Sequence, residues 1–238
     1  MTLFGKSILA VVPARGGSKG IPRKNLRKIS GKSLIKHASE ICKALPFLDY
    51  SIISTDDKEM ASEARDCGLE VPFIRPEILG TDNASSVDMW THAWITSEKI
   101  LKKKFDISIL LEPTSPLRVP KDIELCLTEL IKNDYPAVAT VSLMPAHYRP
   151  QKALEIKNDG KIGFYLPNDN SYVPRQKIPP YFYRNGICYA LTRKKLIEEK
   201  TILDESCHAI LINREVINID DPFDLELAEF LFKRSLRK

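Results

Sequence analysis

Residues 13–25, Pro-Ala-Arg-Gly-Gly-Ser-Lys-Gly-Ile-Pro-Arg-Lys-Asn, combine the residue types that bind polyphosphates. The three glycines allow the backbone to turn sharply and to come close to a ligand. Two arginines and two lysines place four positive charges within ten residues (Arg15, Lys19, Arg23 and Lys24). Main-chain amides and cations in one loop favour an anion with several negative charges. The sequence therefore predicts a polyphosphate-binding loop.

Two familiar phosphate loops do not fit this segment. The dinucleotide pattern G-x-G-x-x-G fails because neither Gly16 nor Gly17 has glycines at the required offsets. Gly31-Lys32-Ser33 resembles the end of a P-loop, but Leu26 stands where that motif requires glycine. We therefore interpret residues 31–33 as the start of a helix with a serine cap.

Polar residues also follow other predicted strands. Glu112, Thr114 and Ser115 come directly after a buried apolar run, in a turn that two prolines stiffen. Arg75 follows another short run, and Ser86 lies just beyond it. Both groups are candidates for a ligand site at the rim of a sheet, and an ordinary turn with a capping serine is the alternative.

Arginines and amides bracket the end of a proline-rich region. Arg175-Gln176 and Tyr183-Arg184-Asn185 are suited to a substrate that carries a carboxylate and hydroxyl groups, because arginine binds carboxylates with two parallel hydrogen bonds. A pair of solvated loops is the alternative interpretation.

Asn218 and Asp220 are two residues apart on a predicted strand, so their side chains share one face. Two oxygen ligands beside a triphosphate loop are suited to Mg²⁺, which uses one or two carboxylates together with phosphates and water. A strand end followed by a helix cap is the alternative.

The elements that must position these residues follow a β-α-β-α order, which predicts a Rossmann-like α/β fold with a mostly parallel sheet and helices on both faces. Asp56-x-x-Glu59 resembles a capping box at the second helix, so we interpret Asp56 as structural. The order breaks at about residues 145–180, where prolines are frequent and Asn158-Asp159-Gly160 predicts a hairpin turn. We predict an inserted arm there. The predicted strands are residues 8–12, 51–54, 71–74, 107–111, 137–141, 187–191 and 216–219, and the predicted helices are 34–45, 60–67, 87–101, 123–131 and 222–236.

Length and composition predict a single domain over residues 1–238, long enough to bury a large core. The net charge of +5 is spread along the chain, so we expect no nucleic-acid partner. The five cysteines are far apart and without metal-ligand spacing, as in a reduced protein. No signal peptide or segment of transmembrane length is visible, so we expect no membrane association and a cytoplasmic location.

Taken in order, these motifs resemble the acylneuraminate cytidylyltransferase (CMP-sialic acid synthetase) family over nearly the full length of the chain. The matching segments are Pro13–Asn25, Ser54–Asp57, Arg75-Pro76, Pro113–Arg118, Arg175-Gln176, Asn185-Gly186, Ile217–Asp220, Asp224-Leu225 and Ala228-Glu229.

This resemblance implies a nucleotide-diphospho-sugar transferase fold, a Mg²⁺ cofactor and a homodimer. It also implies that CTP and a nine-carbon 2-keto sugar acid give a CMP-sugar and pyrophosphate. In that reaction a sugar hydroxyl attacks the α-phosphate in line, and catalysis is chiefly alignment and charge neutralisation.

The resemblance further implies roles for individual residues. The nucleotide would be bound by Ala14, Arg15, Gly16, Gly17, Ser18, Lys19, Gly20, Lys24, Asn25, Arg75 and Ser86. The sugar acid would be bound by Glu112, Thr114, Ser115, Arg175, Gln176, Tyr183 and Asn185. Lys24, Asp220 and Arg15 would be catalytic, with Asp220 and Asn218 on the metal.

Two positions depart from the family pattern, which usually has aspartate at Asn218 and glutamine at Glu112. An asparagine contributes no charge to a metal site, so metal affinity should fall. A glutamate would repel a sugar carboxylate unless it meets a hydroxyl, an amine or a metal. Glu112 therefore points to an altered sugar, such as a legionaminate- or pseudaminate-type acid. The alternatives are a cytidylyltransferase for another ulosonate, such as an eight-carbon acid, and a CTP-binding protein with impaired catalysis.

Overall fold

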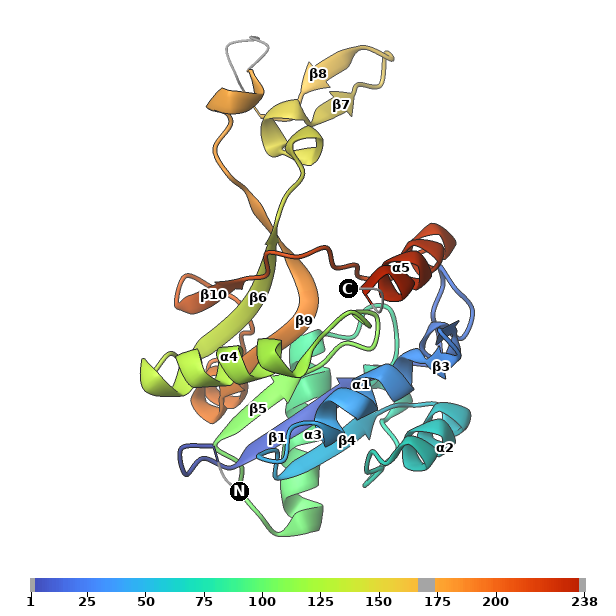
Figure 1. Ribbon diagram of the computed structural model, residues 1–238, viewed down its shortest axis with the longest axis vertical. Helices are drawn as coiled ribbons and strands as arrows, with labels where there is room; N and C mark the ends of the chain where they lie inside the picture. Colours follow the sequence, from blue (N-terminus) through green and yellow to red (C-terminus); the bar gives the residue numbers. More distant parts are fainter. Residues whose placement is uncertain (1–2, 167–173, 236–238) are drawn as a thin grey trace.

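The computed structural model describes residues 3–166 and 174–235, and its centre is a six-stranded sheet (Figure 1). The strand order is β10-β6-β9-β5-β1-β4. All neighbouring pairs are parallel except the two that β9 makes, so a mostly parallel sheet is confirmed. The strands are β1 (Ile8–Pro13), β4 (Tyr50–Ser54), β5 (Ile107–Leu110), β6 (Ala137–Leu143), β9 (Phe182–Thr192) and β10 (Cys207–Leu211).

Alternate residues of β1 enter two apolar cores, one on each face of the sheet, because successive strand side chains point to opposite faces. Val12 packs in the core beneath α1, α2 and α4, and Val11 packs with Trp90 and Trp94 of α3. Helices therefore cover both faces, as expected (Figure 1). The helices are α1 (Leu34–Lys43), α2 (Lys58–Cys67), α3 (Ser86–Leu101), α4 (Pro120–Lys132) and α5 (Pro222–Ser235).

Short elements complete the loops near the sheet. They are η1 (Lys24–Leu26), β2 (Lys28–Ile29), β3 (Lys32–Ser33), η2 (Glu77–Leu79) and η6 (Lys194–Glu198). The predicted serine cap is confirmed, since Ser33 Oγ accepts a hydrogen bond from Lys36 N at the start of α1. None of the described helices is long and apolar enough to cross a membrane.

Three local predictions are wrong. Residues 71–74 and 216–219 form no strand, although Ile219 N donates a hydrogen bond to Thr114 O, and β10 forms at Cys207–Leu211. Asp57 rather than Asp56 caps α2, because its carboxylate accepts the amides of Glu59 and Met60. Strand pairing and cap choice depend on distant partners, which a short apolar or acidic pattern does not contain.

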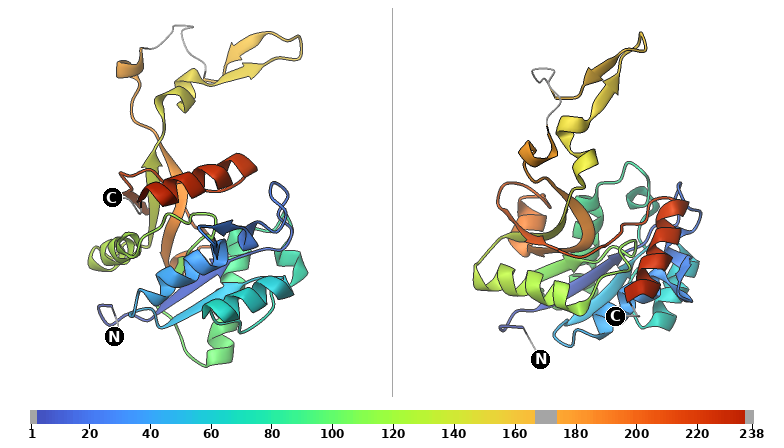
Figure 2. Two further views of the ribbon diagram at one scale, coloured as in Figure 1. Left: turned by 45° about the vertical axis from the view of Figure 1, so that its right-hand side comes forward. Right: turned by 45° about the horizontal axis from the view of Figure 1, so that its top comes forward.

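The chain between β6 and β9 leaves the body of the molecule and forms an arm (Figure 2). Its hairpin pairs Leu154–Ile156 with Ile162–Phe164, so the predicted turn at Asn158–Gly160 is confirmed. The arm's further elements are η3 (Ala146–Tyr148), η4 (Pro150–Lys152) and η5 (Arg175–Lys177).

Candidate active site

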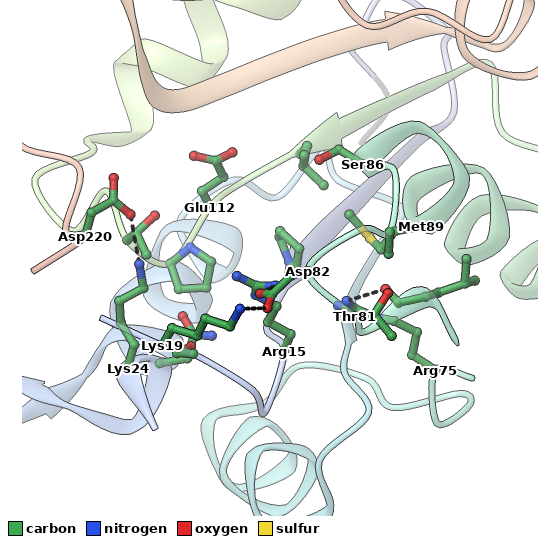
Figure 3. Close-up of a pocket in the computed structure, with 18 of the residues that line it drawn as sticks. Arg15, Lys19, Lys24, Arg75, Thr81, Asp82, Ser86, Met89, Glu112 and Asp220 are labelled. Atoms are coloured by element: carbon green, nitrogen blue, oxygen red, sulfur yellow. Dashed lines mark hydrogen bonds and ion pairs between the residues drawn. The ribbon is translucent and has the colours of Figure 1, made fainter. Parts of the chain in front are cut away.

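A cavity of about 460 Å³ opens where β1 and β5 end, since Pro13 and Leu110 both line it (Figure 3). Parallel strands end at the same edge of the sheet, which is the usual position of ligand sites in open α/β folds. Besides these two residues, the lining is Arg15, Ser18, Lys19, Gly20, Lys24, Asn25, Arg75, Leu79, Thr81, Asp82, Ala84, Ser85, Ser86, Met89, Glu112, Pro113, Thr114 and Asp220.

The phosphate-loop candidate is held by two contacts with other parts of the chain. Gly16 N donates a hydrogen bond of 2.9 Å to Asp56 Oδ1, which explains why Asp56 does not cap α2. A side chain at Gly20 would collide with the backbone oxygen of Asp220, so glycine allows the loop to lie against the C-terminal segment. These two contacts hold the loop beside the cavity at the edge of the sheet.

Asp82 neutralises two cations of this loop. Its carboxylate lies 2.7 Å from Arg15 Nη1 and 2.5 Å from Lys19 Nζ (Figure 3). Hydrogen bonds from Lys19 and Arg15 lower the pKa of Asp82. The sequence does not predict this role of Asp82, because residues 80–85 form an irregular loop with no pattern that indicates a partner. The carboxylate stands where an anionic ligand of these cations would bind.

Lys24 connects the loop to the C-terminal segment. Its Nζ lies 3.0 Å from Asp220 Oδ1 and donates a 2.7 Å hydrogen bond to Ile219 O. The Lys24 side chain is 15% exposed and that of Asp220 is 77% exposed. A largely buried ammonium and an accessible carboxylate therefore face the same cavity (Figure 3).

Glu112 projects from the turn after β5 toward the same cavity (Figure 3). Burial raises the pKa of its carboxyl group, and Asp220 adds to this rise. The cations of Arg118, Arg184 and Lys24 act in the opposite direction. A carboxylate with an elevated pKa in a cavity is typical of a functional site.

Asn218 does not line the cavity, but its side chain and that of Glu112 both lie close to Gly186. A Cβ added to Gly186 would contact Glu112 Oε2 and would lie 3.4 Å from Asn218 Nδ2. The other amide atom, Asn218 Oδ1, is buried and has no hydrogen-bond partner among the described residues. The expected shared strand face is therefore wrong, because residues 216–219 form no strand.

The side-chain oxygen atoms at and near the cavity determine whether the expected Mg²⁺ could bind there. Within the described part of the chain, no three His, Cys, Asp or Glu side chains form a metal-binding group. Asp220, Glu112 and Asn218 Oδ1 nevertheless are the hard oxygen donors that Mg²⁺ requires, and this cation regularly takes its remaining ligands from phosphates and water. The donor set fits Mg²⁺ only together with a bound triphosphate.

Arg75 also lines the cavity, but it is only 5% exposed and its guanidinium is engaged by the protein. It donates to Ser54 Oγ at 3.1 Å, to Ser54 O, and to Leu79 O at 3.3 Å. Burial lowers the pKa of Arg75 to about 10. The hydrogen bonds of Arg75 therefore hold the end of β4 and Leu79 together in the cavity wall. Asn25 and Ser86 line the same cavity.

Three predicted contact residues have side chains that are buried in the protein, and their contacts with a ligand stay predictions. Ala14 is fully buried. Ser115 Oγ donates to Asn185 O at 2.9 Å. The Asn185 amide accepts from Thr140 Oγ1 at 2.6 Å and donates to Ser142 Oγ at 3.0 Å. This network joins β6, β9 and the turn after β5, and it gives the side chains of Ser115 and Asn185 partners within the protein.

The remaining predicted residues divide into two groups. Thr114 lines the cavity, whereas Gly16 and Gly17 belong to the loop without lining it. Gln176 and Tyr183 line neither this cavity nor the second one described below. Gln176 is exposed on the arm, and the Arg175 side chain lies outside the described part of the structure.

A second cavity of about 260 Å³ adjoins the first, because both are lined by Ser86, Leu110 and Glu112. Its other lining residues are Val87, Arg184, Tyr189, Lys200, Thr201, Ile202 and Leu203. The segment that contains Arg184 was predicted to lie at the site, but the residues expected to contact the sugar acid were its neighbours Tyr183 and Asn185. An arginine in this segment was enough to indicate an anion-binding residue. The sequence alone does not show that the Arg184 side chain points into the cavity.

Comparisons with known proteins agree with this geometry. A family model described as "Cytidylyltransferase" matches residues 9–219. A CMP-N,N'-diacetyllegionaminic acid synthase from Legionella pneumophila is 33% identical over 229 residues, covering 95% of this chain and 96% of the relative. A pseudaminic acid cytidylyltransferase from Campylobacter jejuni is 29% identical over 230 residues, covering 94% and 96%. The solved structure of a CMP:2-keto-3-deoxy-manno-octonic acid synthetase complexed with CTP shares the fold, with a TM-score of 0.70, 19% identity and coverage of 96% and 99%.

Proposed function

Because the chain belongs to the cytidylyltransferase family, we propose that it activates a nonulosonic 2-keto sugar acid with CTP, giving a CMP-sugar and pyrophosphate. The observation that carries this proposal is the cavity at the ends of β1 and β5, where Arg15, Lys19 and Lys24 converge. The names of the similar proteins, which act on legionaminic and pseudaminic acids, support the class of sugar.

The reaction forms one bond and breaks one bond. A hydroxyl oxygen of the sugar acid attacks the α-phosphorus of CTP, the bond to the β-phosphate oxygen breaks, and pyrophosphate leaves with both electrons of that bond. The hydroxyl proton passes to a base, for which Asp220 is our candidate. Arg15 and Lys19 would hold the departing phosphates once Asp82 releases them, and Lys24 would stabilise the charge that develops.

We propose Mg²⁺ as the cofactor, held by Asp220 and by the amide oxygen of Asn218. When bound, the cation neutralises phosphate charge. The exposed Asp220 carboxylate and the unpartnered Asn218 Oδ1 support these ligands. Asn218 carries no charge, so we expect weaker metal binding than two aspartates would provide.

We also propose a homodimer formed through the arm. Several large apolar side chains of the arm and its base are exposed: Leu143, Tyr148, Leu154, Ile156, Ile162, Phe164, Tyr165 and Phe182. Apolar surface concentrated on one projecting segment is typical of an association site. Ile156→Glu should convert a dimer into a monomer in sedimentation, whereas Phe230→Glu, on the exposed face of α5, should not. Identical masses for all three proteins would contradict this proposal.

A cytoplasmic location also remains a proposal. All five cysteines are free, and free thiols are maintained where the environment is reducing.

The direct test is pyrophosphate release from CTP and Mg²⁺, run in parallel with N,N'-diacetyllegionaminate, pseudaminate, N-acetylneuraminate and an eight-carbon ulosonate. Release with a nine-carbon acid supports the proposal and identifies the substrate. Release with the eight-carbon acid alone would support the other ulosonate reaction. CTP binding without release from any acid would indicate a protein with impaired catalysis.

A further inference from the structure

The main chain around Asp220 is held by three other parts of the protein, and the inference drawn from these contacts rests on the proposed function. Ile219 N donates a hydrogen bond of 2.9 Å to Thr114 O, in the turn after β5. Ile219 O accepts a hydrogen bond of 2.7 Å from Lys24 Nζ. Asp220 N donates a hydrogen bond of 2.8 Å to Asp224 Oδ2. The peptide group between Ile219 and Asp220 therefore has partners within the protein for both its carbonyl and its amide.

These contacts take the place of a sheet. Residues 216–219 form no strand, and the Asp220 side chain is largely exposed. An exposed segment outside a sheet ordinarily bonds its backbone groups to water and moves more than the elements that it connects. The direction of the Asp220 side chain therefore depends on the few hydrogen bonds that fix its backbone.

Asp224 belongs to the first turn of α5, where it also takes part in a helix cap. Its Oδ2 accepts a hydrogen bond of 3.1 Å from Asp221 N, and Asp221 Oδ1 accepts one of 2.9 Å from Asp224 N. This reciprocal pair is a capping box, in which the side chain of the third helical residue bonds the amide of the cap residue. The bond from Asp220 N reaches one residue further back and is not part of that motif. The Asp224 carboxylate thus holds both the cap of α5 and the residue before it.

Lys24 and Asp224 hold Asp220 from different sides. Lys24 lines the first cavity, and its Nζ lies 3.0 Å from Asp220 Oδ1 (Figure 3). A bound phosphate would share that ammonium and so weaken its bond to Asp220. Asp224 lines neither cavity, so a ligand there leaves its hydrogen bond from Asp220 N intact. Hydrogen bonds to an ionised acceptor are roughly twice as strong as neutral ones, which suits this contact to a lasting role.

We propose that Asp224 is a positioning residue, whose carboxylate holds the main chain of Asp220 so that the Asp220 carboxylate faces the cavity before metal and nucleotide bind. Of the two proposed metal ligands, Asp220 and Asn218, only Asp220 is charged. A displaced Asp220 is therefore not compensated by a second carboxylate, and metal binding depends strongly on the Asp224 contact. Asp221, in contrast, only caps α5.

The test measures Mn²⁺ binding by electron paramagnetic resonance with CTP present and no sugar acid, so that it does not depend on turnover. Asp224→Ala should weaken Mn²⁺ binding about tenfold, the loss expected when a residue that orients a metal ligand is removed. Asp224→Asn should lose only about threefold, because the amide oxygen still accepts the hydrogen bond but the charge is lost.

Asp221→Ala is the matched control, because it removes the other half of the same capping box. Asp221→Ala and Asp224→Ala should each lower the melting temperature by about 2–4 °C, as expected for the loss of a helix cap. Mn²⁺ binding should stay within about twofold in Asp221→Ala. Equal weakening of Mn²⁺ binding in both variants would show that Asp224 acts only through the stability of α5.

A double variant tests whether Asp224 acts through Asp220. If it does, Asp220→Ala combined with Asp224→Ala should bind Mn²⁺ as weakly as Asp220→Ala alone, because the residue to be positioned is already gone. Losses that multiply would overturn the inference. Exchange of the Asp220 amide hydrogen, followed by nuclear magnetic resonance in the ligand-free protein, should become at least about tenfold faster in Asp224→Ala, since its acceptor is removed.

The outcomes separate this inference from the proposed function. If the wild-type protein releases no pyrophosphate with any acid, the proposed reaction fails, and Mn²⁺ binding with CTP still decides the role of Asp224. Weaker Mn²⁺ binding in Asp220→Ala with unchanged binding in Asp224→Ala would overturn the inference alone. Unchanged Mn²⁺ binding in Asp220→Ala would overturn the proposed metal ligand and the positioning role together.

Discussion

Lys24 Nζ lies 3.0 Å from Asp220 Oδ1, joining the cationic loop to a segment 196 residues later in the chain. The same ammonium bonds Ile219 O, so one side chain both carries charge into the cavity and holds the segment that delivers Asp220. The loop and the proposed metal ligand are therefore coupled through the Lys24 ammonium, in addition to the close approach of Gly20 to Asp220 O.

Lys24→Ala should lower kcat by roughly 10²–10³-fold, the loss expected when one preorganised donor to a developing anion is removed. The melting temperature should change little, because most of the fold does not contact Lys24. Steady-state kinetics and calorimetry measure the two effects. Lys28→Ala, on the exposed face of β2, is the matched control. A near-normal kcat would remove Lys24 from the catalytic residues.

Asp220→Ala should raise the Mg²⁺ concentration for half-maximal turnover by at least about tenfold, because one charged ligand is lost from a site that has few of them. Titration of turnover with Mg²⁺, and of Mn²⁺ binding by electron paramagnetic resonance, would measure this change. Unchanged turnover at limiting Mg²⁺ would show that Asp220 does not hold the metal.

Asp82→Asn should strengthen CTP binding by about three- to tenfold, because the carboxylate that competes with phosphate for Arg15 and Lys19 is removed. Calorimetric titration without Mg²⁺ isolates this effect, and the gain should shrink at high salt. Asp66→Asn, on the surface of α2, is the control for charge alone. Weaker CTP binding in Asp82→Asn would show instead that Asp82 orders the loop for its ligand.

Gly186→Ala should destabilise the fold by about 2–4 kcal/mol, because it combines a positive φ of 69° with crowding. The new Cβ would collide with the Glu112 carboxylate and lie 2.7 Å from Ser115 Oγ. Gly31→Ala is a matched control with φ of 79° and open space, and should cost only about 1 kcal/mol. The free energy of unfolding in urea measures both losses. Equal losses for Gly186→Ala and Gly31→Ala would show that the neighbours of Gly186 move aside without destabilising the fold.

Glu112→Gln should raise the melting temperature of the ligand-free protein at pH 8 and have little effect at pH 4. Burial raises the pKa of Glu112 in the folded protein, so the folded state holds the proton more tightly than the unfolded chain. At low pH the carboxyl group is protonated in both the folded and the unfolded state, so its ionisation does not lower the free energy of unfolding. As the pH rises from the unfolded to the folded pKa, ionisation increasingly destabilises the folded state. Glu124→Gln on the exposed face of α4 is the control, and a pH-independent difference would contradict the buried position of the charge.

The sequence determined the features that depend on neighbouring residues. The strand predicted at residues 8–12, the glycine-rich cationic loop and the helix after Ser33 follow from local periodicity, glycine placement and capping, and the structure has all three, with the strand extended to Pro13. Charge and glycine content made the loop recognisable because its chemistry lies within thirteen consecutive residues.

Only the tertiary structure decided which polar residues reach the cavity. Asp82 meets Arg15 across 67 positions, and Asn185 turns into a network with Thr140 and Ser142 although its neighbour Arg184 faces the second cavity. Adjacent residues on a strand point to opposite faces, so a shift of one position exchanges a buried structural amide for a ligand-facing guanidinium. That register is set by pairing with distant strands, and a single sequence does not contain it.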